Sequence, residues 1–165
     1  MGKCKQGFKN MWPIVNVLHM VDDDKPCMDF VYESIDHCKE AIASSFNNVE
    51  VDYQELWDLI VQRWKMMHSP LHAAAYYLDP RLFGLSRHRD EEVMNGLIQA
   101  IEKLNPDPVI AGLVRCQLRA YRLEEGLFGT QSTKYDRSIS DLAVWWEFYR
   151  LGAPKLQKFA IRILS

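Results

Sequence analysis

The sequence predicts an all-α protein, an irregular multi-helix bundle of about eight helices without a sheet. Three observations support this fold class. Apolar residues recur at steps of three and four along most of the chain, and this spacing gathers them on one face of a helix. Proline, glycine and asparagine separate these runs at helical lengths. The alternation of apolar and polar residues that is typical of strands is scarce.

The composition is that of an ordinary globular chain with its own core. The 165 residues are 48% hydrophobic and 25% charged, with a formal net charge of -2. These values exclude a collagen-like repeat, a polar low-complexity tail and a peptide that binds nucleic acid by charge alone. The four cysteines form no CxxC pair, so we expect reduced thiols in an intracellular protein rather than a zinc ribbon or a disulfide scaffold.

The first two long apolar runs predict a pair of amphipathic helices. In the segment 27–48 the apolar positions step by 4, 3, 4 and 4, at Val31, Ile35, Cys38, Ile42 and Phe46. In the segment 53–67 a similar rhythm passes through Leu56, Trp57, Ile60, Val61, Trp64 and Met67. The earlier apolar stretch, 12–21, is interrupted by polar residues and proline, and it is too short for a bilayer, which requires about 20 residues. No membrane partner is therefore predicted.

Proline and small residues define the next helix. Ser69 is expected to cap it, with Pro70 at its first position. Asp79, which precedes Pro80, is expected to end it, because a residue before proline is disfavoured in the helical region. The three consecutive alanines at 73–75 allow another helix to approach closely, which predicts that this short helix is buried.

Two longer helices and a polar segment are predicted downstream. One helix covers 90–104 and has acidic residues in its first turn. The next covers 109–127 and ends near two glycines. The segment 129–140 is polar and without clear periodicity, so it is predicted to be the main boundary of the chain.

Two helices are expected after this segment. Ser140 and Asp141 can cap a helix that contains the sequence WWEFY, and the last helix begins at Ala153 and Pro154. Its amphipathic pattern is still running at Ser165. This ending predicts a fragment, or a gene that has lost its tail.

The histidines form no convincing metal site. His68 and His72 are four residues apart, as in a helical metal site, but the spacing crosses the expected helix start and no third ligand lies nearby. A structural or surface role is the simpler interpretation. The adjacent His37 and Cys38 are likewise better explained as helix positions than as a ligand pair.

The carboxylates also favour structural roles. The acidic triplet 22–24 could attract a divalent cation, but it is not followed by the alternating acids of a calcium loop, so a turn and a cap are expected. Glu147 and Asp79 have no second group at a defined distance, as acid–base chemistry requires, so surface or capping roles are expected. No phosphate-binding or nucleophile-elbow motif occurs. No catalytic residue, metal, cofactor or small-molecule substrate is predicted.

Charge and aromatic residues are unevenly distributed. Positions 21–58 carry a net charge of -9, which is typical of a solvated helical face, and 150–165 carry +4 without an acid. Four cations are few for a nucleic-acid interface, although they could contact phosphate. These possible phosphate contacts are Arg150, Lys155, Lys158 and Arg162. The tryptophans at helical spacing could stack on bases, but core or interface positions are the first expectation. They are Trp57, Trp64, Trp145 and Trp146.

Four blocks stand in a specific order along the chain. They are PIVNVLHMVDDDKPCM, FVYESIDHCKEAI, LWDLIVQRWKMMHSPLHAAAYYLDPRLF and WWEFYRLGAPKLQKFAIRILS. Together they resemble the C-terminal half of plant hAT-family transposases, and the resemblance covers most of the chain. Its most specific parts are the tryptophan-containing helix that leads to PLHAAAYYLDP and the terminal block.

The resemblance implies a ribonuclease-H-like transposase with an N-terminal zinc finger, three catalytic carboxylates, a helical insertion and a C-terminal dimerisation region. Residues 1–130 would correspond to the insertion, and 135–165 to the start of the dimerisation region. The core sheet is therefore expected to be absent or rudimentary. None of the family's catalytic carboxylates maps onto this chain, so we expect no enzymatic activity. Nuclear location is implied by the family alone.

The resulting hypothesis is a catalytically incomplete helical protein that associates with itself or with a related hAT transposase. The association surface is expected in the apolar end of the chain, left partly exposed by the missing continuation. The candidates are Trp145, Trp146, Phe148, Leu156, Phe159, Ala160 and Ile163. The alternative is a nucleic-acid-binding fragment that uses the basic C-terminal helix, and an active nuclease is the least favoured possibility.

Overall fold

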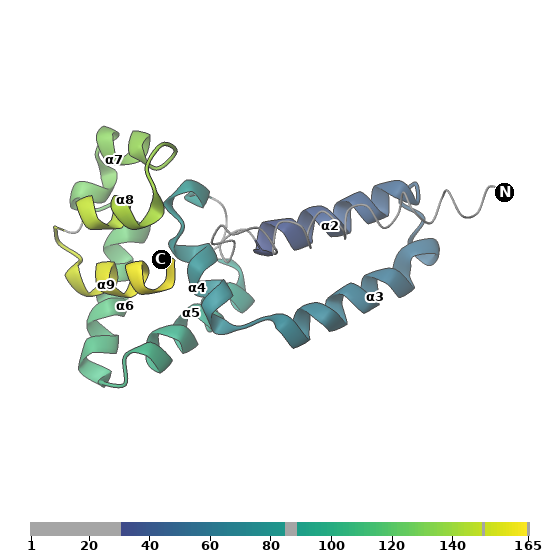
Figure 1. The fold of residues 1–165 in the computed structure, drawn as a ribbon, viewed down its shortest axis with the longest axis horizontal. Helices are drawn as coiled ribbons and strands as arrows, with labels where there is room; N and C mark the ends of the chain where they lie inside the picture. The colour runs from purple at the N-terminus through teal and green to yellow at the C-terminus, as the bar shows by residue number, and fades with distance from the viewer. Residues whose placement is uncertain (1–30, 85–88, 150, 165) are drawn as a thin grey trace. The chain divides into compact units, whose positions relative to one another are not determined.

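The protein is all-helical throughout the residues that its computed structural model describes, which are 31–84, 89–149 and 151–164. These ranges hold eight α-helices, α2 to α9, and two 3-10 helices, η1 and η3 (Figure 1). The predicted all-helical character is therefore confirmed for these residues. The chain divides into two compact units, with the division between Ser69 and Pro70. No helix in the described ranges is long and apolar enough to cross a membrane.

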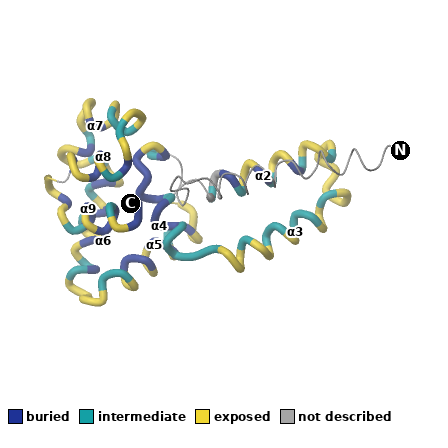
Figure 2. Tube along the Cα trace, viewed as in Figure 1, coloured by how far each residue is buried: buried dark blue, intermediate teal, exposed yellow. Residues whose placement is uncertain are grey.

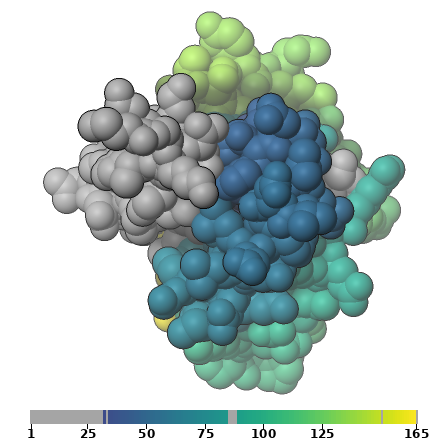
Figure 3. All heavy atoms as spheres, turned by 90° about the vertical axis from the view of Figure 1, so that its right-hand side faces the viewer, coloured from purple at the N-terminus to yellow at the C-terminus, as the bar shows by residue number. Residues whose placement is uncertain are grey.

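The described part of unit one is a helical hairpin of α2 (Val31–Ser45) and α3 (Glu50–Met67) (Figure 1). Two asparagines close α2, because Asn47 and Asn48 adopt positive φ values of 55° and 58°. The Asn48 N–H donates to the carbonyl of Ala43 at 2.8 Å, as in a helix C-terminal motif with a left-handed residue. The tip of the hairpin is at the surface in the space-filling view (Figure 3).

Aromatic rings join the two helices of the hairpin. The rings of Tyr32 on α2 and Trp64 on α3 lie edge to face, with centroids 4.9 Å apart, and the ring of Phe46, just after α2, lies 6.4 Å from that of Tyr53 on α3. Ser34, Cys38 and Ile42 of α2 are buried. None of the residues of α3 is buried, and the helix shows only intermediate and exposed positions (Figure 2). A two-helix hairpin therefore leaves much of the apolar side of α3 only half covered.

Unit two contains the remaining helices. They are α4 (Pro70–Leu78), η1 (Pro80–Leu82), α5 (Glu91–Leu104), α6 (Pro108–Arg122), η3 (Gly126–Gly129), α7 (Gln131–Asp136), α8 (Leu142–Phe148) and α9 (Pro154–Leu164). Their starts follow the sequence signals closely. Asp90, Asp107 and Asp141 each accept backbone N–H groups of the first turn that follows them. Pro70, Pro108 and Pro154 occupy the first helical position.

Small residues let α4 and α5 approach each other closely. Ala73, Ala74 and Ala75 are fully buried, as their sequence predicts. A Cβ atom built on Gly96 of α5 would lie 2.5 Å from the Cβ of Ala73, which is closer than two non-bonded carbon atoms can come. The contact therefore requires glycine at one of the two positions, and it fixes the distance between the helices.

Two predicted boundaries are wrong. The helix expected over 109–127 ends at Arg122, because Glu124 adopts a positive φ of 53° and turns the chain. The segment 129–140, expected to be irregular, contains α7, whose first turn is capped by the hydroxyl of Thr130. The segment 129–140 lies inside unit two, and the division between the two units falls between Ser69 and Pro70. How 1–130 and 135–165 correspond to the transposase segments stays a prediction.

Candidate functional site

Most of the residues predicted to form an association surface belong to the core of unit two. Six of the seven are at most 8% exposed, and only Phe148, at 75%, lies at the surface. The buried six are Trp145, Trp146, Leu156, Phe159, Ala160 and Ile163. The expectation that these side chains are exposed is therefore wrong. The physical reason is that α9 packs against α4, α6 and α8 within the same chain, so these helices cover its apolar face.

The two adjacent tryptophans illustrate this burial. Trp146 is fully buried, and its indole N–H donates to the carbonyl of Leu78 at 3.1 Å. The indole N–H of Trp145 donates to the carbonyl of Thr133 at 3.2 Å. Both rings contact Tyr121 of α6, with centroid distances of 6.2 Å for Trp145 and 5.0 Å for Trp146. Because each polar tip has a partner, the pair is a satisfied core element rather than a free stacking platform.

A different set of apolar side chains is exposed at α8. Val144, Phe148 and Leu151 are 54%, 75% and 72% exposed. Val144 and Phe148 are four residues apart, so they are neighbours along one side of α8, and Leu151 lies in the turn after the helix. We call them the α8 strip. The opposite side of α8 carries the buried tryptophans, so this short helix has an apolar face toward the core and a second apolar strip toward solvent.

Three of the four basic residues of the C-terminal end are described, and all three lie on α9. Lys158 is exposed and Lys155 is half-buried, and the guanidinium of Arg162 donates to the carbonyl of Leu104 at 3.2 Å. Arg150 lies outside the described residues. The three described cations share the outer side of α9, which contains no acid. Three or four cations are few for a nucleic-acid interface, as the sequence already indicates.

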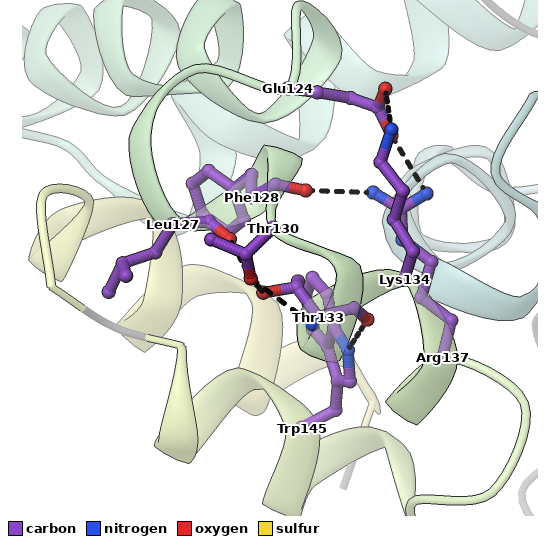
Figure 4. A network of polar contacts seen from close by, with 8 residues as sticks. All are labelled: Glu124, Leu127, Phe128, Thr130, Thr133, Lys134, Arg137 and Trp145. Atoms are coloured by element: carbon purple, nitrogen blue, oxygen red, sulfur yellow. Dashed lines mark hydrogen bonds and ion pairs between the residues drawn. The ribbon is translucent and has the colours of Figure 1, made fainter.

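A network of charged groups anchors the turn between α6 and α7 (Figure 4). The ammonium of Lys134 donates to Glu124 at 2.8 Å, and the guanidinium of Arg137 lies 3.1 Å from the same carboxylate. Arg137 also donates to the carbonyl of Phe128 at 3.3 Å and stacks on Phe83, with its central carbon 3.8 Å from the ring centroid. These bonds hold Glu124 in its left-handed conformation, which is rare for a residue other than glycine.

This network makes a pH-dependent contribution to stability. The hydrogen bond from Lys134, with further contributions from Arg137, lowers the pKa of Glu124 below its usual value. The folded chain thus keeps this carboxylate ionised at pH values where the unfolded chain has protonated it. The stabilisation is complete at pH values above the pKa that Glu124 has in the unfolded chain. It is lost as the pH falls through the lower pKa that Glu124 has in the folded chain. Between neutral and acidic pH, the free energy of unfolding is therefore expected to fall less for Glu124→Gln than for wild type. Urea unfolding at a series of pH values measures this difference.

The control for this prediction is Glu147→Gln, which neutralises an exposed carboxylate on α8 that has no role in the network. It should retain the acid sensitivity of the wild-type chain. Equal acid sensitivity in Glu124→Gln and wild type would show that the network contributes nothing to the pH dependence.

The other polar candidates have structural positions. Asp79 is fully buried and caps η1, where its carboxylate accepts the backbone N–H of Arg81 at 2.8 Å and the Arg81 guanidinium at 2.9 Å, so its capping role is confirmed. His68 is the C-cap of α3 and forms a hydrogen bond with the hydroxyl of Tyr32, whereas His72 belongs to α4 of unit two. Glu147 is exposed, and the triplet 22–24 lies outside the described residues.

In the described ranges, no group of three or more His, Cys, Asp or Glu side chains could hold a metal ion. His37 and Cys38 point in different directions on α2, since His37 is exposed and Cys38 is buried. Burial raises the pKa of the Cys38 thiol, which favours its neutral form.

One structurally important residue gave no signal in the sequence. The side-chain oxygen of Gln117, in the middle of α6, accepts the backbone N–H groups of Lys155 and Leu156 at 2.8 and 3.0 Å. It thus caps the first turn of α9 from another helix. Capping signals are recognised from residues adjacent in sequence, so a cap supplied from 38 positions away could not be found in this way.

The comparisons with known proteins identify no relative. No family model, no curated protein and no solved structure matches this chain.

Proposed function

We propose that this chain is a transposase-derived, catalytically incomplete helical protein that acts by associating with another protein through the α8 strip. The observation that carries the proposal is the exposure of Val144, Phe148 and Leu151 beside a core that is otherwise well covered. Aromatic side chains are enriched at protein–protein interfaces, because burying them removes much apolar surface from water.

The position of the strip agrees with the resemblance described for the sequence. The strip lies within 135–165, the segment that resembles the start of the hAT dimerisation region. A second copy of the chain or a related hAT transposase is accordingly the proposed partner, and the nucleus is the proposed location. The surface is not the one that the sequence predicted: of the seven residues named there, the strip retains Phe148 alone.

The proposal includes no catalysis. Strand cleavage by the family requires carboxylates that converge on two divalent cations, and none of these carboxylates can be mapped onto the sequence. The chain is therefore proposed to bind other proteins without cutting or joining DNA.

The variant Phe148→Ser tests the strip directly. Replacing the aromatic side chain of the strip should weaken association roughly tenfold or more, because it is the expected energetic centre of the contact. The measurement is sedimentation velocity over a concentration series of the whole chain, alone and mixed with a related transposase. Circular dichroism should remain that of wild type, since the side chain makes little contact with the core.

The matched control is Val109→Ser, at an apolar position of α6 that is 68% exposed and lies outside the strip. It should associate as wild type does. A wild-type chain that binds neither itself nor the relative, or a Phe148→Ser chain that binds equally well, would contradict the proposal. Binding to DNA that persists in Phe148→Ser and weakens steeply with salt would favour the nucleic-acid alternative.

A further inference from the structure

One side of α3 carries a second pattern of apolar and charged residues. Asp52, Leu56, Leu59 and Arg63 are separated by steps of four, three and four, so they form a continuous line along the helix. Leu59 is 50% exposed and Leu56 is half-buried, while both charged residues are exposed. We call these four residues the α3 stripe.

The stripe is distinct from the side of α3 that contacts α2. On the inner side Trp64 contacts Tyr32, Tyr53 contacts Phe46, and Trp57 stacks on Tyr53. Successive helical residues are about 100° apart, which places the centre of the stripe roughly 110° from the centre of the three α3 rings. The stripe is thus an edge of the hairpin, where another helix can pack beside α3 as in a four-helix bundle.

Charge is segregated along α3 in a way that favours an antiparallel neighbour. The first half of the helix carries only acids and the second half only bases. The acids are Glu50, Asp52, Glu55 and Asp58, and the bases are Arg63 and Lys65. A copy of α3 that runs in the opposite direction brings the acidic half of each helix beside the basic half of the other. A parallel copy would place like charges side by side.

We propose that the α3 stripe pairs with the α3 stripe of a second copy of this chain about a two-fold axis. The spacing fits this arrangement in a single register. When Leu56 faces Leu59 of the second copy, Asp52 faces Arg63 of the second copy, and the two-fold axis repeats both contacts. The line of residues is therefore complementary to its own reverse, with apolar pairs at the centre and an ion pair at each end.

The second copy also supplies what the hairpin lacks. Helices are stabilised mainly by packing of an apolar face, and α3 buries none of its residues in the described part of unit one. Within the described residues, neither Asp52 nor Arg63 forms an ion pair. In the proposed register, Asp52 of each copy faces Arg63 of the other copy across the two-fold axis. This contact is independent of the α8 strip, and the two proposals can fail separately.

A charge-swap series tests the pairing. The experiment uses the whole chain carrying Phe148→Ser, so that association through the α8 strip does not contribute. Either Asp52→Arg or Arg63→Asp alone places like charges opposite each other at both ends of the stripe, and should weaken dimerisation roughly tenfold in sedimentation equilibrium. The double variant restores opposite charges in the reversed order, and should recover most of the lost affinity.

The matched control is Glu50→Arg. It also reverses a first-turn acid of α3 and therefore changes the interaction with the helix dipole as Asp52→Arg does. Glu50, and Lys65 at the same level of the opposing helix, each lie roughly 150° around their helix from the centre of the stripe, so both point away from the second copy. It should dimerise as the parent does. A parent that stays monomeric at all concentrations would overturn the proposal. So would a double variant as weak as the two single variants, because recovery is the result that only reciprocal pairing produces.

Discussion

Trp146→Ala is expected to cost about 3–5 kcal/mol of unfolding free energy, the range for removing a buried aromatic side chain. The indole extends from α8 and is fully buried against α4 and α6. Its ring centroid lies 5.0 Å from that of Tyr121 and 5.2 Å from that of Trp145. The substitution also leaves the carbonyl of Leu78 without the indole donor. A domain of ordinary stability has 5–15 kcal/mol in total, so the variant should be close to unfolded at physiological temperature.

Urea unfolding followed by circular dichroism measures this loss. Phe148→Ala is the matched control, because it truncates an aromatic side chain two residues further along the same helix that is 75% exposed. It should change stability by less than about 0.5 kcal/mol. The pair separates the core from the surface of α8: similar costs for the two variants would mean that the burial assigned to Trp146 is wrong.

Gly96→Ala is expected to destabilise the chain by about 1–3 kcal/mol, although alanine is the better helix former. The new methyl group would lie 2.5 Å from the Cβ of Ala73 and 3.7 Å from the Cα of Pro70. Relief of the first contact requires α4 and α5 to separate, and both are fully packed at this point. The cost of overpacking should therefore exceed the gain in helix propensity.

Gly112→Ala is the control for this effect. Gly112 also lies inside a helix, α6, but no atom outside its own helix backbone and neighbours lies within 4 Å of the added Cβ. This variant should gain roughly 0.5–1 kcal/mol, the ordinary difference between glycine and alanine in a helix. The double variant Gly96→Ala with Ala73→Gly should recover part of the lost stability. A stabilised Gly96→Ala chain would contradict the close approach of the two helices.

The resemblance to hAT transposases and the exposure of the C-terminal apolar residues are different kinds of expectation. The first rests on four blocks of sequence and is part of the proposed function. The second was a statement about packing, and it is wrong for Trp146 and Phe159 because α9 has partners within its own chain. An amphipathic helix shows that a face needs cover, but its sequence does not say which element supplies that cover.

What the sequence by itself determined was local: the all-helical class, the cap at Asp141, the prolines 70 and 154 that begin helices, and the burial of the alanines of α4. These features depend on residues within a turn or two of each other, where propensity and hydrogen bonding act directly. Only the tertiary structure decided that Trp146 is core while Phe148 is surface, that Gln117 caps α9, and that the chain divides after Ser69. Each depends on which distant elements meet, because side-chain burial is a property of the packed helices together rather than of any one of them.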